Sequence, residues 1–207
     1  MFAKGVHCNM NAVSYCYKVR SFLLSRTEDY LFCMNDLEEL APYDSIRREV
    51  ADLAKRGLIS RICQGVYWVN RSGLETPDPD EIAATIARSN NWVIVPGTPL
   101  ARFKLGLSDE FPRVPGYLST GHTKTFYSPD GIPRIAFQHS SGKFLFFANA
   151  RTSLLISALM DQQRHPTTPQ EILHLSGTLS AEDKAIIMKD REFINPRIRP
   201  IIDVICR

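Results

Sequence analysis

The sequence has no long apolar run, and its N-terminal end lacks the apolar core of a signal peptide. No stretch of the 207 residues is both long and apolar enough to span a bilayer. Residues 1–7 read MFAKGVH, which does not resemble an export signal. We therefore expect a cytoplasmic protein without a membrane partner.

Close cysteine pairs are also missing, and this argues against a zinc site. The five cysteines are odd in number, widely spaced, and free of any C-x-x-C pair. We interpret them as reduced thiols that mostly fill the core. They are Cys8, Cys16, Cys33, Cys63 and Cys206.

Motifs for catalysis are scarce as well. The chain contains neither a Walker loop nor a G-x-S-x-G element, so we expect no cofactor, no metal and no enzymatic activity. His122 falls in an ordinary polar strand or turn, His139 ends a strand before a loop, and Asp109, Glu110 and Asp130 fall in separate loops. A nuclease site assembled from distant residues stays open as an alternative.

What the chain does have is an ordinary globular composition with a mild basic excess. Hydrophobic residues make up 44% and charged residues 23%, enough for a sizeable core. The 25 Lys and Arg against 22 Asp and Glu give a net charge of +3. A charge this small does not identify nucleic acid as the partner, so the placement of the charges must decide.

The N-terminal third predicts three helices followed by a hairpin. Apolar residues recur at helical spacing, Pro42 separates the second and third helices, and Gly57 is placed to end the third. The expected helices span 13–25, 36–40 and 44–56, and the strands 58–62 and 66–69. A linker at 71–79, rich in Ser, Gly and Pro, then separates a domain at 10–71 from one at 80–207.

The second region alternates between helical and strand patterns. Asn149, the capping box that starts at Thr168, and Ser180 each mark a helix start in its C-terminal part. The expected helices before that part span 81–88 and 98–106, and the strands 92–95, 117–127, 132–139 and 143–147. The predicted fold is α+β, with an N-terminal winged helix-turn-helix followed by a mixed domain with a small antiparallel sheet and C-terminal helices.

The segment 41–70 has the pattern of a DNA-reading module. A helix fits the major groove, and arginine can pair with guanine through two hydrogen bonds. The outward face of the third helix is expected to carry Ser45, Arg47, Arg48, Asp52 and Lys55. The hairpin after it would be a wing that contacts phosphates or the minor groove. The candidate DNA-binding residues are Ser45, Arg47, Arg48, Lys55, Arg56, Arg61 and Gln64.

Two other interpretations apply to these charges. Asp44, Glu49 and Asp52 dilute the basic face, and mixed charges on an exposed helix are usually a solvated surface. Winged helices also serve as protein–protein adaptors that have no affinity for DNA. Four cations of the second domain could form a further basic surface, or they could be ordinary solvated charges. They are Arg102, Lys104, Arg113 and Lys124.

A family resemblance rests on this same segment. The run D-x-x-x-L-A-P…SIRREVADLAKRGLISRICQGVY starts at Asp36 and resembles the N-terminal domain of AbiEi-type antitoxins of type IV toxin–antitoxin systems. Those domains show a (K/R)-G-x-I-x-R-x-x-x-G-x-Y wing. Matching residues are Lys55, Arg56, Gly57, Ile59, Arg61, Gly65 and Tyr67.

The resemblance continues into the second domain and covers roughly residues 30–140. Pro77 with Ile82-Ala83, the LGLS run 105–108, and Pro115, Tyr117 and Thr120-Gly121 are similar to the family pattern. The helices after Asn149 have no match in it.

The resemblance implies a transcriptional repressor that binds inverted repeats in its own promoter. It also implies an antitoxin that counteracts a nucleotidyltransferase-type toxin. In that case Ser45, Arg47, Arg48 and Arg61 carry the DNA role. A stand-alone regulator whose second domain senses a ligand is the main alternative.

Overall fold

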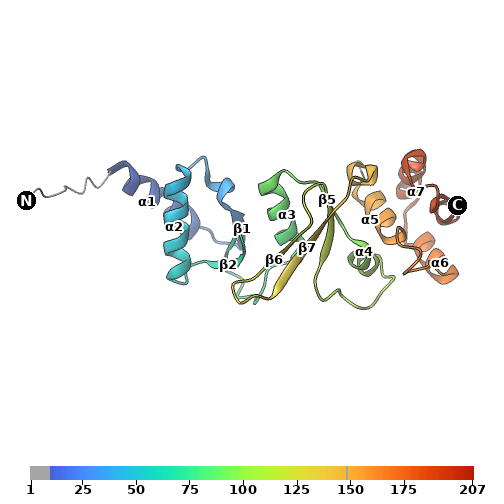
Figure 1. Ribbon diagram of the computed structural model, residues 1–207, viewed down its shortest axis with the longest axis horizontal. Helices are drawn as coiled ribbons and strands as arrows, with labels where there is room; N and C mark the ends of the chain where they lie inside the picture. The colour runs from blue at the N-terminus through green and yellow to red at the C-terminus, as the bar shows by residue number, and fades with distance from the viewer. Residues whose placement is uncertain (1–9, 148) are drawn as a thin grey trace, which may run out of the picture. The chain divides into compact units, whose positions relative to one another are not determined.

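The computed structural model describes residues 10–147 and 149–207, which form a mixed α+β protein with two small sheets (Figure 1). The predicted α+β class is confirmed. By contact the chain divides into two compact units. The first contains the described residues up to Asn91 together with Phe126–Ile132, and the second contains Trp92–Thr125 and Pro133–Arg207. Within the described residues, no helix has the length and apolar character needed to cross a membrane.

The first unit is built on a small antiparallel sheet with strand order β1-β3-β2. The central strand pairs with both neighbours, so that Val66 lies opposite Cys33 on one side and Cys63 on the other. Fully buried side chains from the two long helices form the core of this unit, including Val19, Ile46 and Leu53. In chain order its first elements are α1 (Met10–Leu24), β1 (Tyr30–Cys33), the 3-10 helix η1 (Met34–Leu37), α2 (Tyr43–Lys55), β2 (Ser60–Cys63) and β3 (Val66–Val69).

Two of these elements differ from the sequence prediction. Strand β1 was not expected, because its short apolar run has no period and its partner β3 lies far along the chain. The short helix predicted at 36–40 is a 3-10 turn at Met34–Leu37 instead. Both elements are set by tertiary contacts rather than by local pattern.

The last helix of the first unit is α3 (Pro79–Asn90). Its N-cap is Asp78, and it packs against β1, β3 and η1. Arg88 donates two hydrogen bonds, of 2.9 and 2.8 Å, to the Asp36 carboxylate. We expected the second domain to begin at residue 80, whereas the division by contact falls after Asn91 because α3 covers the first sheet.

The second unit contains most of a four-stranded sheet that is mixed rather than antiparallel as expected. Its strand order is β4-β5-β7-β6, and β5 runs parallel to β7, with Tyr117 opposite Phe137. The two strands on either side of the expected turn at 128–131 are neighbours in the sheet, but β7 also pairs with β5 on its other side. The strands are β4 (Ile94–Pro96), β5 (Gly116–Ser119), β6 (Lys124–Tyr127) and β7 (Pro133–His139).

The strand expected over 117–127 is interrupted at a close approach of backbone and side chain. A Cβ on Gly121 would lie 2.0 Å from the Trp92 ring, so only glycine fits there. The third expected strand, 143–147, is the 3-10 helix η2 (Lys143–Phe146). A continuous apolar run does not distinguish a strand from a helical turn, and Phe144 and Leu145 both enter the core.

The C-terminal helices start where local capping signals predict. Asn149 accepts hydrogen bonds from the backbone N–H groups of Arg151 and Thr152, and Thr168 and Ser180 each form a capping box. The helices of this unit are α4 (Thr98–Lys104), α5 (Ala150–Leu159), α6 (Pro169–Thr178), α7 (Ala181–Lys189), the 3-10 turn η3 (Arg191–Phe193) and α8 (Arg199–Ile205). Helix α8 was not expected.

Candidate nucleic-acid interface

Helix α2 is an amphipathic helix with sharply separated faces. Ile46, Val50 and Leu53 are fully buried at i, i+4 and i+7, and they anchor the helix on the first core. The helix ends in a Schellman motif at Gly57, which has a φ of 71°. The Leu58 N–H bonds the Leu53 carbonyl at 3.0 Å, and the Gly57 N–H bonds that of Ala54 at 3.1 Å. The C-terminal end of the helix is therefore fixed.

The opposite face of α2 is exposed to solvent. Its residues recur at i, i+3, i+4, i+7 and i+11, which places them on one line of the helix surface. They are Asp44, Arg47, Arg48, Ala51 and Lys55. This face carries more cations than carboxylates.

The other carboxylates of α2 are bound to an arginine from α1. Arg20 Nε lies 2.6 Å from the carboxylate of Glu49, which is buried, and its terminal nitrogen lies 3.3 Å from Asp52. The Glu49 hydrogen bond raises the pKa of Arg20 above its ordinary value. Arg56 also pairs with Asp52, at 3.0 Å. Two of the three acidic residues that seemed to dilute the basic face, Glu49 and Asp52, are thus neutralised on the side that faces α1, while Asp44 stays on the exposed face.

Two of the predicted DNA-binding residues, Ser45 and Arg56, belong to this same flank of α2. Ser45 is half-buried, and its carbonyl accepts a weak hydrogen bond from the Cys16 thiol at 3.8 Å. Burial raises the pKa of that thiol, so it stays protonated near neutrality. Asp52, also expected on the outward face, faces Arg20. Ser45 and Arg56 therefore lie beside the exposed face rather than on it.

The β2–β3 hairpin follows α2 directly and carries the two remaining candidates. Gln64 and Gly65 form its two-residue turn, with Gly65 at a φ of 80°. Arg61 is exposed on β2 opposite Tyr67, next to a register shift between Arg61 and Cys63. Such a bulge strengthens the local twist of the strand. The hairpin presents Arg61 and the Gln64 turn to solvent.

The outward cations have little or no partner within their own unit. Arg47 approaches Asp44 only to 3.8 Å, and both side chains are largely exposed, at 66% and 86%. Such a contact contributes little. Across residues 14–147 and 149–207, no hydrogen bond or ion pair engages the side chains of Arg48, Lys55 or Arg61. These cations remain available to an external anion.

The comparison with protein families decides where the chain belongs. The model of DUF6088, a family of unknown function, matches residues 18–187. The chain belongs to this family. No curated protein and no solved structure matches the chain. The family match spans most of both units, so one family model describes the greater part of each.

Arg102 does not belong to the second basic surface that the sequence suggested. Arg102 is only 8% exposed and forms an ion pair with Glu171 of α6, so it supports the packing of α4 on α6. Arg113 is exposed. The sequence pattern failed here because Glu171 lies 69 positions away.

The histidines considered for catalysis lie in the second unit, His139 at the end of β7 and His122 in the loop between β5 and β6. His139 Nδ1 lies 2.9 Å from the Gly121 carbonyl, and His122 is exposed. In the part of the chain that the structure describes, no group of three or more His, Cys, Asp or Glu side chains is placed to hold a metal ion.

Arg20 is the residue of this region that sequence reasoning missed. It lies 29 positions from Glu49 and 32 from Asp52, so no local spacing connects them. The one feature of the sequence that could have indicated such a partner is the position of Glu49 itself. It follows Ile46 by three and precedes Leu53 by four, which places a carboxylate on the buried face and implies a cationic partner.

Proposed function

We propose that the first unit is a winged helix-turn-helix that binds double-stranded DNA through the outward face of α2 and the β2–β3 hairpin. The separation of charge on α2 carries the proposal. Glu49 and Asp52 are held by Arg20, while Arg48 and Lys55 face solvent without a partner among the described residues. An exposed helix face with cations left over is suited to a polyanion.

The order of elements supports the same assignment. A helix, a strand, a short helical turn, a second long helix and a two-stranded hairpin follow one another in the first unit (Figure 1). Helix α2 has 13 residues, about 20 Å at 1.5 Å per residue, which suits insertion into the major groove. The hairpin after it is placed in the chain as a wing.

The residues divide into two roles in this proposal. Arg47 and Arg48 lie in the N-terminal half of α2, where a recognition helix meets base edges, and each can bind guanine through two hydrogen bonds. Lys55 and Arg61 are separate point charges that suit phosphates. The first pair would specify sequence, and the second would position the domain.

The biological role that we propose is a repressor of its own promoter that also acts as the antitoxin of a type IV system. This part is supported by the resemblance of residues 30–140 to AbiEi-type antitoxins, in which the wing pattern includes Gly57, Arg61 and Gly65. A repressor of this kind would work in the cytoplasm on inverted repeats. The second unit would then counteract a nucleotidyltransferase-type toxin.

The test of DNA binding is fluorescence anisotropy with a labelled duplex from upstream of the protein's own gene. A scrambled duplex of the same composition is titrated in parallel, at several salt concentrations, because affinity depends steeply on salt. We expect tighter binding to the upstream duplex. Binding to neither duplex would contradict the proposal and favour a protein–protein adaptor.

The antitoxin role has its own test. The protein is co-expressed with the nucleotidyltransferase-type gene of its operon, and growth is compared with that of cells expressing this gene alone. Rescue of growth is expected. An operon without such a gene, or a toxin that arrests growth equally in both strains, would contradict the antitoxin role and leave DNA binding unaffected.

A further inference from the structure

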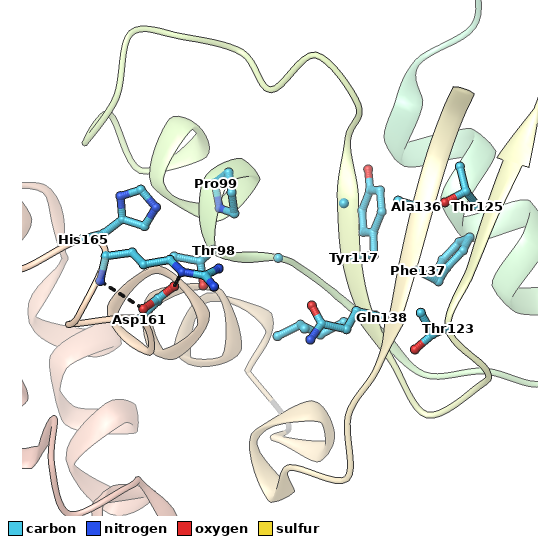
Figure 2. A pocket seen from close by; sticks show the side chains of 14 residues that line it. Thr98, Pro99, Tyr117, Thr123, Thr125, Ala136, Phe137, Gln138, Asp161 and His165 are labelled. Carbon is cyan, nitrogen blue, oxygen red and sulfur yellow. Dashed lines mark hydrogen bonds and ion pairs between the residues drawn. The ribbon is translucent and has the colours of Figure 1, made fainter. Parts of the chain in front are cut away.

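The second unit contains a cavity of about 590 Å3 that the DNA-binding proposal does not use (Figure 2). One wall is the face of the sheet formed by β5, β6 and β7, and the other is formed by the start of α4 and the loop between α5 and α6. Its volume lies within the range of about 300–1,000 Å3 typical of small-molecule sites.

Small residues on the sheet wall create the space. Gly116 and Ala136 lie side by side in register on β5 and β7, and both line the cavity. A Cβ built on Gly116 would meet no atom within 4 Å, so nothing in the described structure fills the volume above it. A Cβ on Gly97 would instead lie 3.1 Å from the Gly116 carbonyl, which shows how closely the α4 turn approaches the sheet.

The opposite wall is held in place by hydrogen bonds rather than by loose loops. Ser157 of α5 donates to the Pro96 carbonyl at 2.6 Å, and Thr98 donates to the Ser157 carbonyl at 2.9 Å. In the α5–α6 loop, the Gln162 amide donates to Thr167 Oγ1 at 2.7 Å and accepts from the Thr167 N–H at 3.0 Å. These hydrogen bonds fix the wall that faces the sheet.

The guanidinium of Arg164 lines this wall and has unused hydrogen-bond donors. Arg164 lies in the hydrogen-bonded α5–α6 loop. Its Nε is 3.9 Å from the Asp161 carboxylate, which is too far for a hydrogen bond. The Arg164 N–H binds the same carboxylate at 3.2 Å, so Asp161 is already partly satisfied by its own loop. His165 follows, and its imidazole faces Pro99 (Figure 2). The planar guanidinium suits a carboxylate or a phosphate.

Uncommitted hydrogen-bonding groups lie on the sheet wall. Figure 2 shows the Gln138 amide extending from β7 towards the side where Thr98 and Asp161 lie. Thr125, from β6, also lines the cavity. Over the described ranges, neither the Gln138 amide nor the Thr125 hydroxyl has a hydrogen-bond partner. A polar ligand would satisfy both.

We infer that this cavity binds a small organic anion. A carboxylate or phosphate group of the ligand pairs with Arg164, and the neutral remainder bonds Gln138 and Thr125 across the small-residue floor. The inference rests on the second unit alone and does not depend on DNA binding. Carboxylates and phosphate monoesters share this chemistry, so both classes belong in the test.

The experiment is isothermal titration calorimetry of the full-length protein with AMP, citrate and adenosine as probes. Arg164→Ala removes the cation, and Gly116→Val fills the floor, where a Cβ meets open space and a strand favours a β-branched residue. Arg197→Ala is the matched control, because Arg197 is also exposed and lies outside the cavity. Thermal melts establish that each variant is folded.

We expect AMP or citrate to bind and adenosine to bind more weakly. Arg164→Ala should weaken binding by about tenfold, the effect of losing one charge-assisted hydrogen bond. Gly116→Val should abolish it, and Arg197→Ala should leave it unchanged. A preference for AMP or for citrate identifies the class of anion. Absence of heat with both anions, adenosine binding as tightly as AMP, or equal binding by folded Arg164→Ala and wild type would each overturn the inference.

Discussion

The arginines of the two units have different surroundings. In the second unit, Arg102, Arg151 and Arg191 each bind a carboxylate; Arg151 lies 2.9 Å from Asp183, and Arg191 binds Asp203 at 2.5 and 2.6 Å. In the first unit, the outward arginines of α2 and β2 have no such partner except the loose contact of Arg47 with Asp44. Arginine therefore stabilises the fold at these three positions of the second unit and is left available for a ligand on the outward face of α2 and on β2.

Arg20 shows how the first unit creates this difference. By binding Glu49 and Asp52 from the α1 side, it removes two negative charges from the field of the exposed helix face. A count of charges along α2 gives three cations and three carboxylates, but the structure gives one neutralised flank and one basic face. Position relative to a partner, rather than residue type, determines the role of each charge.

The largest effect is expected where an arginine is most buried. Arg102→Ala should lower the free energy of unfolding by about 3 kcal/mol, because Glu171 loses its ion-pair partner in a largely buried site. Urea denaturation of the full chain measures this change. Arg113→Ala, at an exposed position of the same unit, should be nearly neutral. Equal losses of stability in the two variants would contradict the distinction between arginines that stabilise the fold and arginines that are exposed without a partner.

A double-mutant cycle tests the role of Arg20. Arg20→Met should destabilise the protein, since the buried Glu49 carboxylate loses its partner. Adding Glu49→Met should restore most of this loss, because no charge remains buried. Chemical denaturation gives both values. Additive losses in the double mutant would show that the two side chains do not interact.

Substitutions of two glycines should change stability by smaller amounts and in opposite directions. Gly57→Ala should cost about 1 kcal/mol, because its φ of 71° strains a residue that has a Cβ although space is open around it. Gly177→Ala, inside helix α6 and equally open, should stabilise by about 0.5–1 kcal/mol. Thermal melts of both variants provide the comparison. A stabilising Gly57→Ala would contradict the Schellman ending of α2.

The smallest expected effect is a pH dependence of stability that comes from the Asp183 carboxylate. Hydrogen bonds from Ser180 and then Arg151 lower the pKa of Asp183 below its ordinary 3.8, so its stabilising contribution is present above that pH and is lost as pH falls through the lowered pKa. Ser180→Ala should therefore be less stable than wild type near neutrality, with the difference shrinking in acid. Melting temperatures across pH report this. A difference that is constant with pH would mean that the cap acts without the charge of Asp183.

The elements that sequence alone predicted are those with local signals. The Gly57 ending, the Asn149 cap and the Thr168 box each depend on residues within a few positions, and the structure confirms all three. Arg61 and Gln64 were also placed correctly on a hairpin, because Gly65 marks its turn.

The features that sequence missed depend on distant partners. Strand β1 exists because β3 pairs with it, the parallel pairing of β5 with β7 follows from the insertion of β7, and Glu49 and Arg102 are explained only by Arg20 and Glu171. Helical periodicity did place Arg47 and Arg48 outward. It did not reveal that α1 covers the flank that carries Ser45, because that requires the position of a second helix.

The most direct test of the central claim compares two triple variants in DNA binding. Arg47→Ala/Arg48→Ala/Lys55→Ala removes cations from the exposed α2 face, and Arg113→Ala/Lys143→Ala/Arg197→Ala removes the same charge from exposed positions of the second unit. Fluorescence anisotropy with the upstream duplex is measured for both at equal salt. We predict a loss of affinity of about a hundredfold or more for the first and little change for the second. Equal losses would contradict the assignment of DNA binding to α2 and leave only a non-specific effect of net charge.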